Sequence, residues 1–86
     1  MYKQMELSDS LRYHMRKNFL QRVSTLQEDG YMVQFMTCRE DSDMWFASLR
    51  YLSEKRTITI VAYPRKNQLI QKKDGTIVHD GILCVV

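Results

Sequence analysis

The hydrophobic period of this chain changes once, at Gly30, and this change limits what the chain can fold into. Before Gly30, apolar residues recur at spacings of three and four, which gathers them on one side of an α-helix with about 3.6 residues per turn. This apolar arc consists of Leu7, Leu11, Met15, Phe19, Val23 and Leu26. After Gly30, apolar and polar residues alternate, and a period of two is typical of β-strands. The sequence therefore predicts one amphipathic helix followed by a sheet.

The predicted helix covers residues 8–28. Ser8 is a suitable N-cap, and Asp9 places a negative charge in the first turn, where it suits the helix dipole. Gly30 suits the position just past the C-terminus, because a left-handed backbone is common there. Arg22 falls inside the apolar arc, and we expect its stem to pack at the edge of the core while its guanidinium reaches water.

Short polar turns divide the rest of the chain into predicted strands, which cover residues 31–39, 44–52, 57–63, 68–73 and 76–80. Asp74-Gly75 predicts a two-residue hairpin of type I′. Gly81 is expected to mark a bulge, or a break before a final apolar run, residues 82–86, that we expect to be buried. Turns this short make antiparallel neighbours. The predicted fold is α+β, with an N-terminal helix packed on a four- to five-stranded antiparallel β-meander. Its element order is similar to that of cystatin-type folds, by analogy only.

One helix can cover only one face of such a sheet, and the other face should then be polar. In the first strand, alternation places Val33 and Phe35 on the same side. If Trp45, Leu49, Ile58 and Ile60 face the helix, the other face carries Phe46, Val61 and Tyr63, with Met44 nearby. Contiguous exposed apolar residues usually mark an interface. We therefore expect this second face to meet a partner or another copy of the chain.

The length of 86 residues predicts one domain with a modest core. Hydrophobic residues make up 44% and charged residues 27%, an ordinary globular composition that argues against a disordered chain. Residues 1–6 are not followed by the apolar segment that a signal peptide would contain. No apolar run approaches the roughly 18 residues of a membrane span. We therefore expect a cytoplasmic protein with no membrane contact, in which Cys38 and Cys84 are free thiols.

The motifs of common catalytic sites are missing from the chain, including a glycine-rich phosphate loop, a GxSxG elbow and an HExxH pair. His14 and His79 are isolated, and with the two cysteines they lack the spacing of a zinc site. The acidic turn Glu40–Asp43 lacks the calcium-loop pattern. We therefore expect no catalytic residues, no metal and no cofactor, and we interpret the chain as non-enzymatic.

The leading interpretation is a small binding or regulatory protein that contacts another protein, or itself. Its size would suit an accessory protein of a phage or mobile element. Tyr13 and Leu20 lie two turns apart on the polar side of the predicted helix and form one candidate contact patch. Phe46, Val61 and Tyr63 form the other, on the sheet.

The alternative is a nucleic-acid-binding module, which the net charge of +3 permits. The candidate contacts are Lys55, Arg56, Arg65, Lys66, Lys72 and Lys73. Alternate turns of a meander share one end of the sheet. Lys55 and Arg56 should therefore lie near Lys72 and Lys73. Phe46, Tyr51 and Tyr63 would offer rings on which unpaired bases stack. The RNP motif of RNA-binding sheets is missing. A third, weaker alternative is an enzyme or carrier with a small-ligand pocket between helix and sheet.

Overall fold

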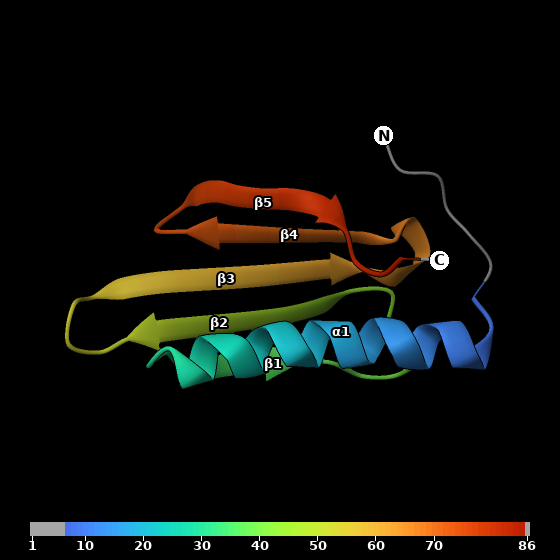
Figure 1. Cartoon of the computed structure of the whole chain (residues 1–86), viewed down its shortest axis with the longest axis horizontal. Coiled ribbons are helices and arrows are strands. Elements are labelled where there is room, and N and C mark those ends of the chain that lie inside the picture. Colours follow the sequence, from blue (N-terminus) through green and yellow to red (C-terminus); the bar gives the residue numbers. More distant parts are fainter. Residues whose placement is uncertain (1–6, 86) are drawn as a thin grey trace.

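The fold, in a computed structural model that describes residues 7–85, is one helix followed by a five-stranded antiparallel sheet (Figure 1). The elements are α1 (Asp9–Glu28), β1 (Met32–Thr37), β2 (Trp45–Tyr51), β3 (Arg56–Tyr63), the 3-10 turn η1 (Pro64–Lys66), β4 (Gln68–Lys73) and β5 (Thr76–Ile82). The strands lie side by side in chain order. The α+β class and the helix-then-meander order predicted from the sequence are confirmed.

Both ends of α1 carry the predicted caps. The Ser8 hydroxyl accepts a hydrogen bond from the Leu11 main-chain N–H at 3.1 Å. At the other end, Gly30 has a φ of +103°, and its N–H donates to the Gln27 carbonyl while the Tyr31 N–H donates to that of Leu26. This pair of bonds is a Schellman motif, which satisfies carbonyls that the last turn leaves free.

The core lies between α1 and one side of the sheet. Figure 1 shows α1 running along β1 and β2, with β4 and β5 beyond its flank. The buried residues of α1 are Met15, Phe19, Val23 and Leu26. They pack with buried sheet and C-terminal residues, which are Trp45, Ala47, Leu49, Ile58, Ile60, Ala62, Leu69 and Leu83. Arg22 lies at the edge of this core, half-buried, and donates a hydrogen bond to the Gln71 side chain at 3.3 Å.

The first strand departs from the predicted alternation because it contains an extra residue. Val33 pairs with Leu49, but Phe35 pairs with Ser48, so Gln34 is bulged out of the ladder. Directly paired residues of antiparallel strands point to the same side. Val33 therefore joins the core with Leu49, whereas Phe35 lies on the opposite face with Ser48. The prediction that Val33 and Phe35 share a side was wrong.

The β4–β5 hairpin confirms the predicted type I′ turn, since Asp74 and Gly75 have φ values of +51° and +85°. The predicted irregularity at Gly81 was misplaced. Gly81 pairs regularly with Leu69 inside β5, and the register shift lies earlier, where Val78 is the extra residue between Ile77 and His79.

The apolar run at residues 82–86 was predicted to be buried, and this is wrong for most of it. Ile82 is 54% exposed and Val85 is 85% exposed, whereas only Leu83 enters the core and Cys84 is half-buried. Val86 lies outside the described residues.

A polar clamp holds this segment in place. The Asn67 side-chain amide donates to the Cys84 carbonyl and accepts from the Cys84 N–H, both at 2.8 Å. The Leu83 N–H donates to the Asn67 carbonyl, and the Asn18 amide donates to the Leu83 carbonyl at 3.1 Å. Asn67 has a φ of +49°, a left-handed conformation that asparagine tolerates well. These long-range bonds hold Leu83 in the core.

Gly30 offers a direct test of how α1 is joined to the sheet. A Cβ added there would lie 2.6 Å from Cε2 of Tyr51, and the positive φ adds a cost of about 1–2 kcal/mol for any other residue. We expect Gly30→Ala to lower the free energy of unfolding by about 2–4 kcal/mol in urea denaturation. Gly75→Ala is the matched control, because Gly75 also has a positive φ but no atom within 4 Å of the added Cβ. Equal losses in the two variants would contradict the steric contact with Tyr51.

Candidate interaction surface

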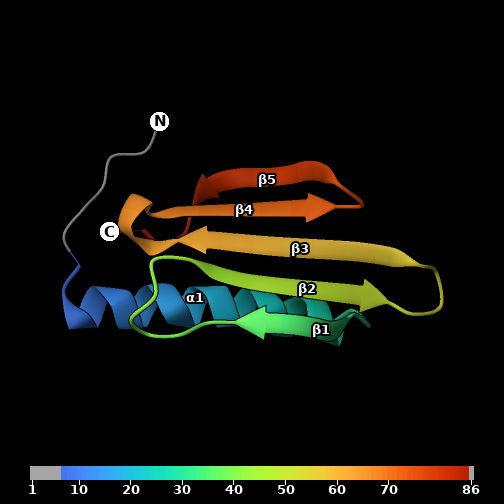
Figure 2. The same ribbon diagram turned by 180° about the vertical axis from the view of Figure 1, so that it is seen from behind.

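Among the described residues, 7–85, no layer covers the sheet face opposite α1. Figure 2 views the molecule from this side, and no helix lies in front of the five strands. The strand register defines two central rows of side chains that cross this face from β1 to β5. One row is Thr37, Phe46, Val61, Ile70 and Asp80, and the other is Phe35, Ser48, Thr59, Lys72 and Ile77. We call this surface the open sheet face.

Half of the residues in these two rows are apolar, and each of the five strands contributes one of them. Phe35 is 59% exposed and Ile77 is 54% exposed, at the two edges of the sheet. Phe46, Val61 and Ile70 are half-buried between them, on the three inner strands. The rings of Phe35 and Phe46 lie 6.0 Å apart between centroids, which is within the range of favourable aromatic pairs. The open sheet face is therefore an apolar band that spans the whole width of the sheet.

The remaining side chains of this face, on either side of the band, are both apolar and polar. Next to the row that contains Phe35 lie Met32, Arg50 and Thr57. Next to the row that contains Phe46 lie Tyr63, Gln68 and Ile82. Met44 and Tyr63 line a shallow hollow of about 250 Å³, where the Lys66 ammonium lies 5.4 Å from the centroid of the Tyr63 ring. A cation at this distance from an aromatic face is weakly attracted to it.

The sheet residues predicted as protein contacts, Phe46, Val61 and Tyr63, all lie on the open sheet face. Tyr51, predicted to offer a ring for stacking, does not. It alternates with Trp45 and Leu49 on the helix side, where its ring meets that of Tyr31 at 5.2 Å between centroids. Phe35 was not predicted as part of this face, because the bulge at Gln34 has no signature in the sequence.

The second predicted patch, on the helix, is smaller than expected. Leu20 is half-buried and packs against the core, so it faces the sheet more than solvent. Tyr13 is 61% exposed, and its ring lies beside His14 and the Lys17 ammonium. The pair therefore does not form a joint apolar surface.

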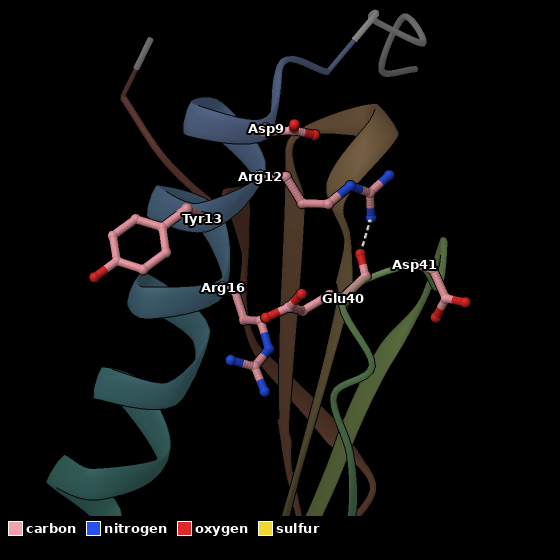
Figure 3. Close-up of a pocket in the computed structure, with 6 residues that line it drawn as sticks. All are labelled: Asp9, Arg12, Tyr13, Arg16, Glu40 and Asp41. Carbon is pink, nitrogen blue, oxygen red and sulfur yellow. Dashed lines mark hydrogen bonds between the residues drawn. The ribbon is translucent and has the colours of Figure 1, made fainter.

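The N-terminal half of α1 borders an open hollow of about 690 Å³ above the β1–β2 loop (Figure 3). Its lining residues are Asp9, Arg12, Tyr13, Arg16, Glu40 and Asp41. Figure 3 shows the Tyr13 ring turned away from the loop and the Arg12 guanidinium bound to the Glu40 carbonyl. The lining mixes both charge signs, and its two arginines are engaged with the protein itself. We therefore interpret this hollow as the seam between α1 and the loop.

Arginine side chains bind this loop to α1 through its main-chain carbonyls. Arg12 donates to the carbonyls of Glu40 and Ser42 at 2.9 and 3.0 Å, and Arg16 donates to that of Cys38 at 2.9 Å. Arg12 also lies 3.9 Å from the Asp43 carboxylate. Hydrogen bonds from charged donors are worth about 1.5–3 kcal/mol each. The spacing of four residues places both arginines on one side of α1, facing the loop.

We expect Arg12→Met to loosen the loop, because the carbonyls of Glu40 and Ser42 lose their charged donor. The Ser42 N–H, which donates to the Arg39 carbonyl, should exchange its hydrogen about tenfold faster or more. Lys17→Met is the matched control, since it removes the same charge from the same helix at an exposed position. Unchanged exchange at Ser42 in Arg12→Met would show that the loop does not depend on this arginine.

Cys38 lies in the same seam. Burial raises the pKa of its thiol above the ordinary value, and the Arg16 guanidinium, through its charge and a hydrogen bond, offsets this only in part. The neutral thiol is therefore the favoured form, which makes Cys38 a poor nucleophile at neutral pH.

This shift in the Cys38 pKa predicts a pH dependence of stability. The folded chain holds the thiol proton more tightly than the unfolded chain does. The contribution of the neutral thiol to the free energy of unfolding is therefore complete at neutral pH and declines as the pH rises past about 9. In a Cys84→Ala background, we expect the unfolding free-energy difference between the parent and Cys38→Ala to shrink from pH 7 to pH 10. Urea denaturation across this range measures it. A constant difference would contradict the shift.

The predicted nucleic-acid contacts lie at the two ends of the sheet, as the meander requires. One end holds Lys55, Arg56, Lys72 and Lys73, and the other holds Arg65 and Lys66. Acidic side chains share both ends. The Arg56 guanidinium is 3.0 Å from Glu54, and that of Arg65 is 3.0 Å from Asp43. These two arginines are therefore partly neutralised.

Comparison of the chain with protein-family models, with curated proteins and with solved structures found no match. Within residues 7–85, no helix has the length and apolar character needed to cross a membrane. In the same part of the chain, no three metal-ligating side chains gather closely enough to hold an ion. The candidate site therefore rests on the geometry of the open sheet face.

Proposed function

We propose that this chain is a non-enzymatic binding protein whose working surface is the open sheet face, through which it contacts another protein. The observation that carries the proposal is the apolar band across a face that no described element covers. Contiguous exposed apolar patches larger than a few hundred Å² are rare on monomeric proteins and usually mark interaction sites. Aromatic residues such as Phe35 and Phe46 are also enriched where proteins meet.

Charge favours a protein over a nucleic acid as the occupant of this face. The two central rows contain one cation, Lys72, and one anion, Asp80. Binding to a phosphate backbone depends on several cations along a continuous track. Here the clustered lysines and arginines lie at the ends of the sheet, and two of the arginines are paired with acidic side chains. A nucleic acid is therefore the competing outcome of the test.

The proposal can be tested by photo-cross-linking in the cells that produce the protein. Benzoylphenylalanine replaces Thr59, a half-buried residue at the centre of the open sheet face, or Ser24, an exposed residue of α1, as the matched control. We expect a discrete protein adduct, at several times the control yield, from position 59 alone. Adducts to nucleic acid from position 59, or equal labelling from both positions, would contradict the proposal.

A further inference from the structure

We infer that the open sheet face binds the same face of a second copy of this chain, so that two sheets form a sandwich with one helix on each outer side. This inference rests on the proposed function, because it names the protein that the face contacts. It requires that the face be complementary to itself and large enough for a dimer interface. It also requires that the sheet edges be less suited than the face to pairing with a second copy.

The register makes the apolar band complementary to itself. Because β3 is the middle of five strands, a two-fold axis parallel to β3, between two facing sheets, exchanges β1 with β5 and β2 with β4. Phe46 then lies opposite the second copy's Ile70, and Phe35 lies opposite the second copy's Ile77. Val61 faces its own counterpart near the axis. The strands of the two sheets are then aligned to within the angle of about 30° typical of sandwiches.

The charges of the face are compatible with the same axis. Lys72 lies opposite the second copy's Ser48, and Asp80 lies opposite its Thr37, so no like charges meet. Arg50 of β2 lies directly opposite Thr57 of β3 in the strand ladder. Asp74 lies on the other side of Thr57, and its carboxylate accepts a hydrogen bond from the Thr57 N–H at 2.9 Å. The axis therefore places Arg50 opposite the second copy's Asp74. Complementary charges at the margin of an interface favour one register over others.

The area of the face suits a modest dimer. Five strands about 4.8 Å apart and about seven residues long at about 3.4 Å per residue project roughly 24 by 24 Å, on the order of 600 Å². Side chains corrugate this surface, so its accessible area exceeds its projection. Stable protein interfaces bury about 800 Å² on each partner. We therefore expect a dimer that forms at high micromolar concentration and dissociates on dilution.

The two edges of the sheet are less suited to pairing with another chain. β1 contains a bulge at Gln34, and β5 contains one at Val78. A bulge interrupts the ladder of main-chain groups and increases the local twist, which is one way in which proteins protect their edge strands. The open sheet face contains no such irregularity on its three inner strands, β2 to β4.

The test is the solution mass of the full chain, by light scattering and sedimentation, over a range of concentrations and at two salt concentrations. We expect the mass to rise from the 10.3 kDa of one chain toward twice that value as the concentration is raised through the high micromolar range. Val61→Lys and Thr59→Arg place two like charges against each other near the axis, and we expect each to weaken the dimer at least tenfold. Val85→Lys is the matched control, since Val85 is 85% exposed and lies beyond the sheet.

Circular dichroism verifies that each variant is folded. A monomer at every concentration would overturn the inference, as would a dimer that both folded variants leave intact. Protein that carries nucleic acid at low salt and loses that mass at high salt would also overturn the inference, because it would indicate that the basic residues bind nucleic acid. A monomer whose position 59 still cross-links to a different protein would overturn this inference alone. A monomer with no such adduct would overturn the proposed function as well.

Cysteine cross-linking distinguishes face pairing from edge pairing. In a Cys38→Ser, Cys84→Ser background, Thr59→Cys places its thiols near the axis, whereas Gln34→Cys places them at the outer edges of β1. The two Gln34→Cys positions would then be about 20 Å apart, given two strand spacings on each side of the axis. With a short bifunctional maleimide, we expect covalent dimers from Thr59→Cys at several times the yield from Gln34→Cys. The reverse order would show that copies pair edge to edge through β1 and would overturn the inference.

Discussion

The packing of one helix against one side of a five-stranded sheet is the interaction on which the rest of this structure depends. A helix with its side chains is about 10 Å across, whereas five strands span about 24 Å. The apolar arc of α1 therefore covers only part of one sheet face and reaches nothing on the other. A second layer would have to come from outside the described chain, and the apolar residues of the open sheet face are the ones that such a layer would bury.

Polar side chains complete the fold where α1 does not reach. At the end of the sheet that holds the β1–β2 loop, Arg12 and Arg16 bind loop carbonyls, and the Trp45 indole donates to the Arg39 carbonyl at 2.7 Å. The Asn67 amide binds the main chain of the C-terminal segment at Cys84. Buried or half-buried main-chain groups need such partners when they lie outside a ladder or a helix. The loops at this end are thus held by side chains from distant elements.

This division between local and distant partners explains which features the sequence predicted. Ser8, Gly30 and Asp74-Gly75 act on neighbouring residues, so the helix ends and the hairpin were predicted correctly. The alternation of β2 and β3 was also predicted, because regular strands on a core preserve a period of two. These signals were enough to place Phe46, Val61 and Tyr63 on the uncovered face.

The features that the sequence did not predict depend on contacts between distant segments. The bulge at Gln34 has no glycine or proline to mark it, and one extra residue moved Phe35 to the open sheet face. The C-terminal run lacks alternation, and its position is set by hydrogen bonds to Asn67, which is distant in the sequence. The bonds of Arg12 end on main-chain carbonyls, which every residue has, so no residue pattern identifies them.

The same contacts make the open sheet face suitable for binding. Association is opposed by the cost of ordering whatever is mobile at the interface, and a surface that is already rigid avoids most of this cost. Every strand that carries the half-buried apolar residues of the face, β2 to β4, is paired on both sides. Their main-chain groups are therefore used within the sheet, and only side chains remain available for contact. Recognition must then depend on shape and on the few charges at the margin, which is the pattern expected when sheets pack face to face.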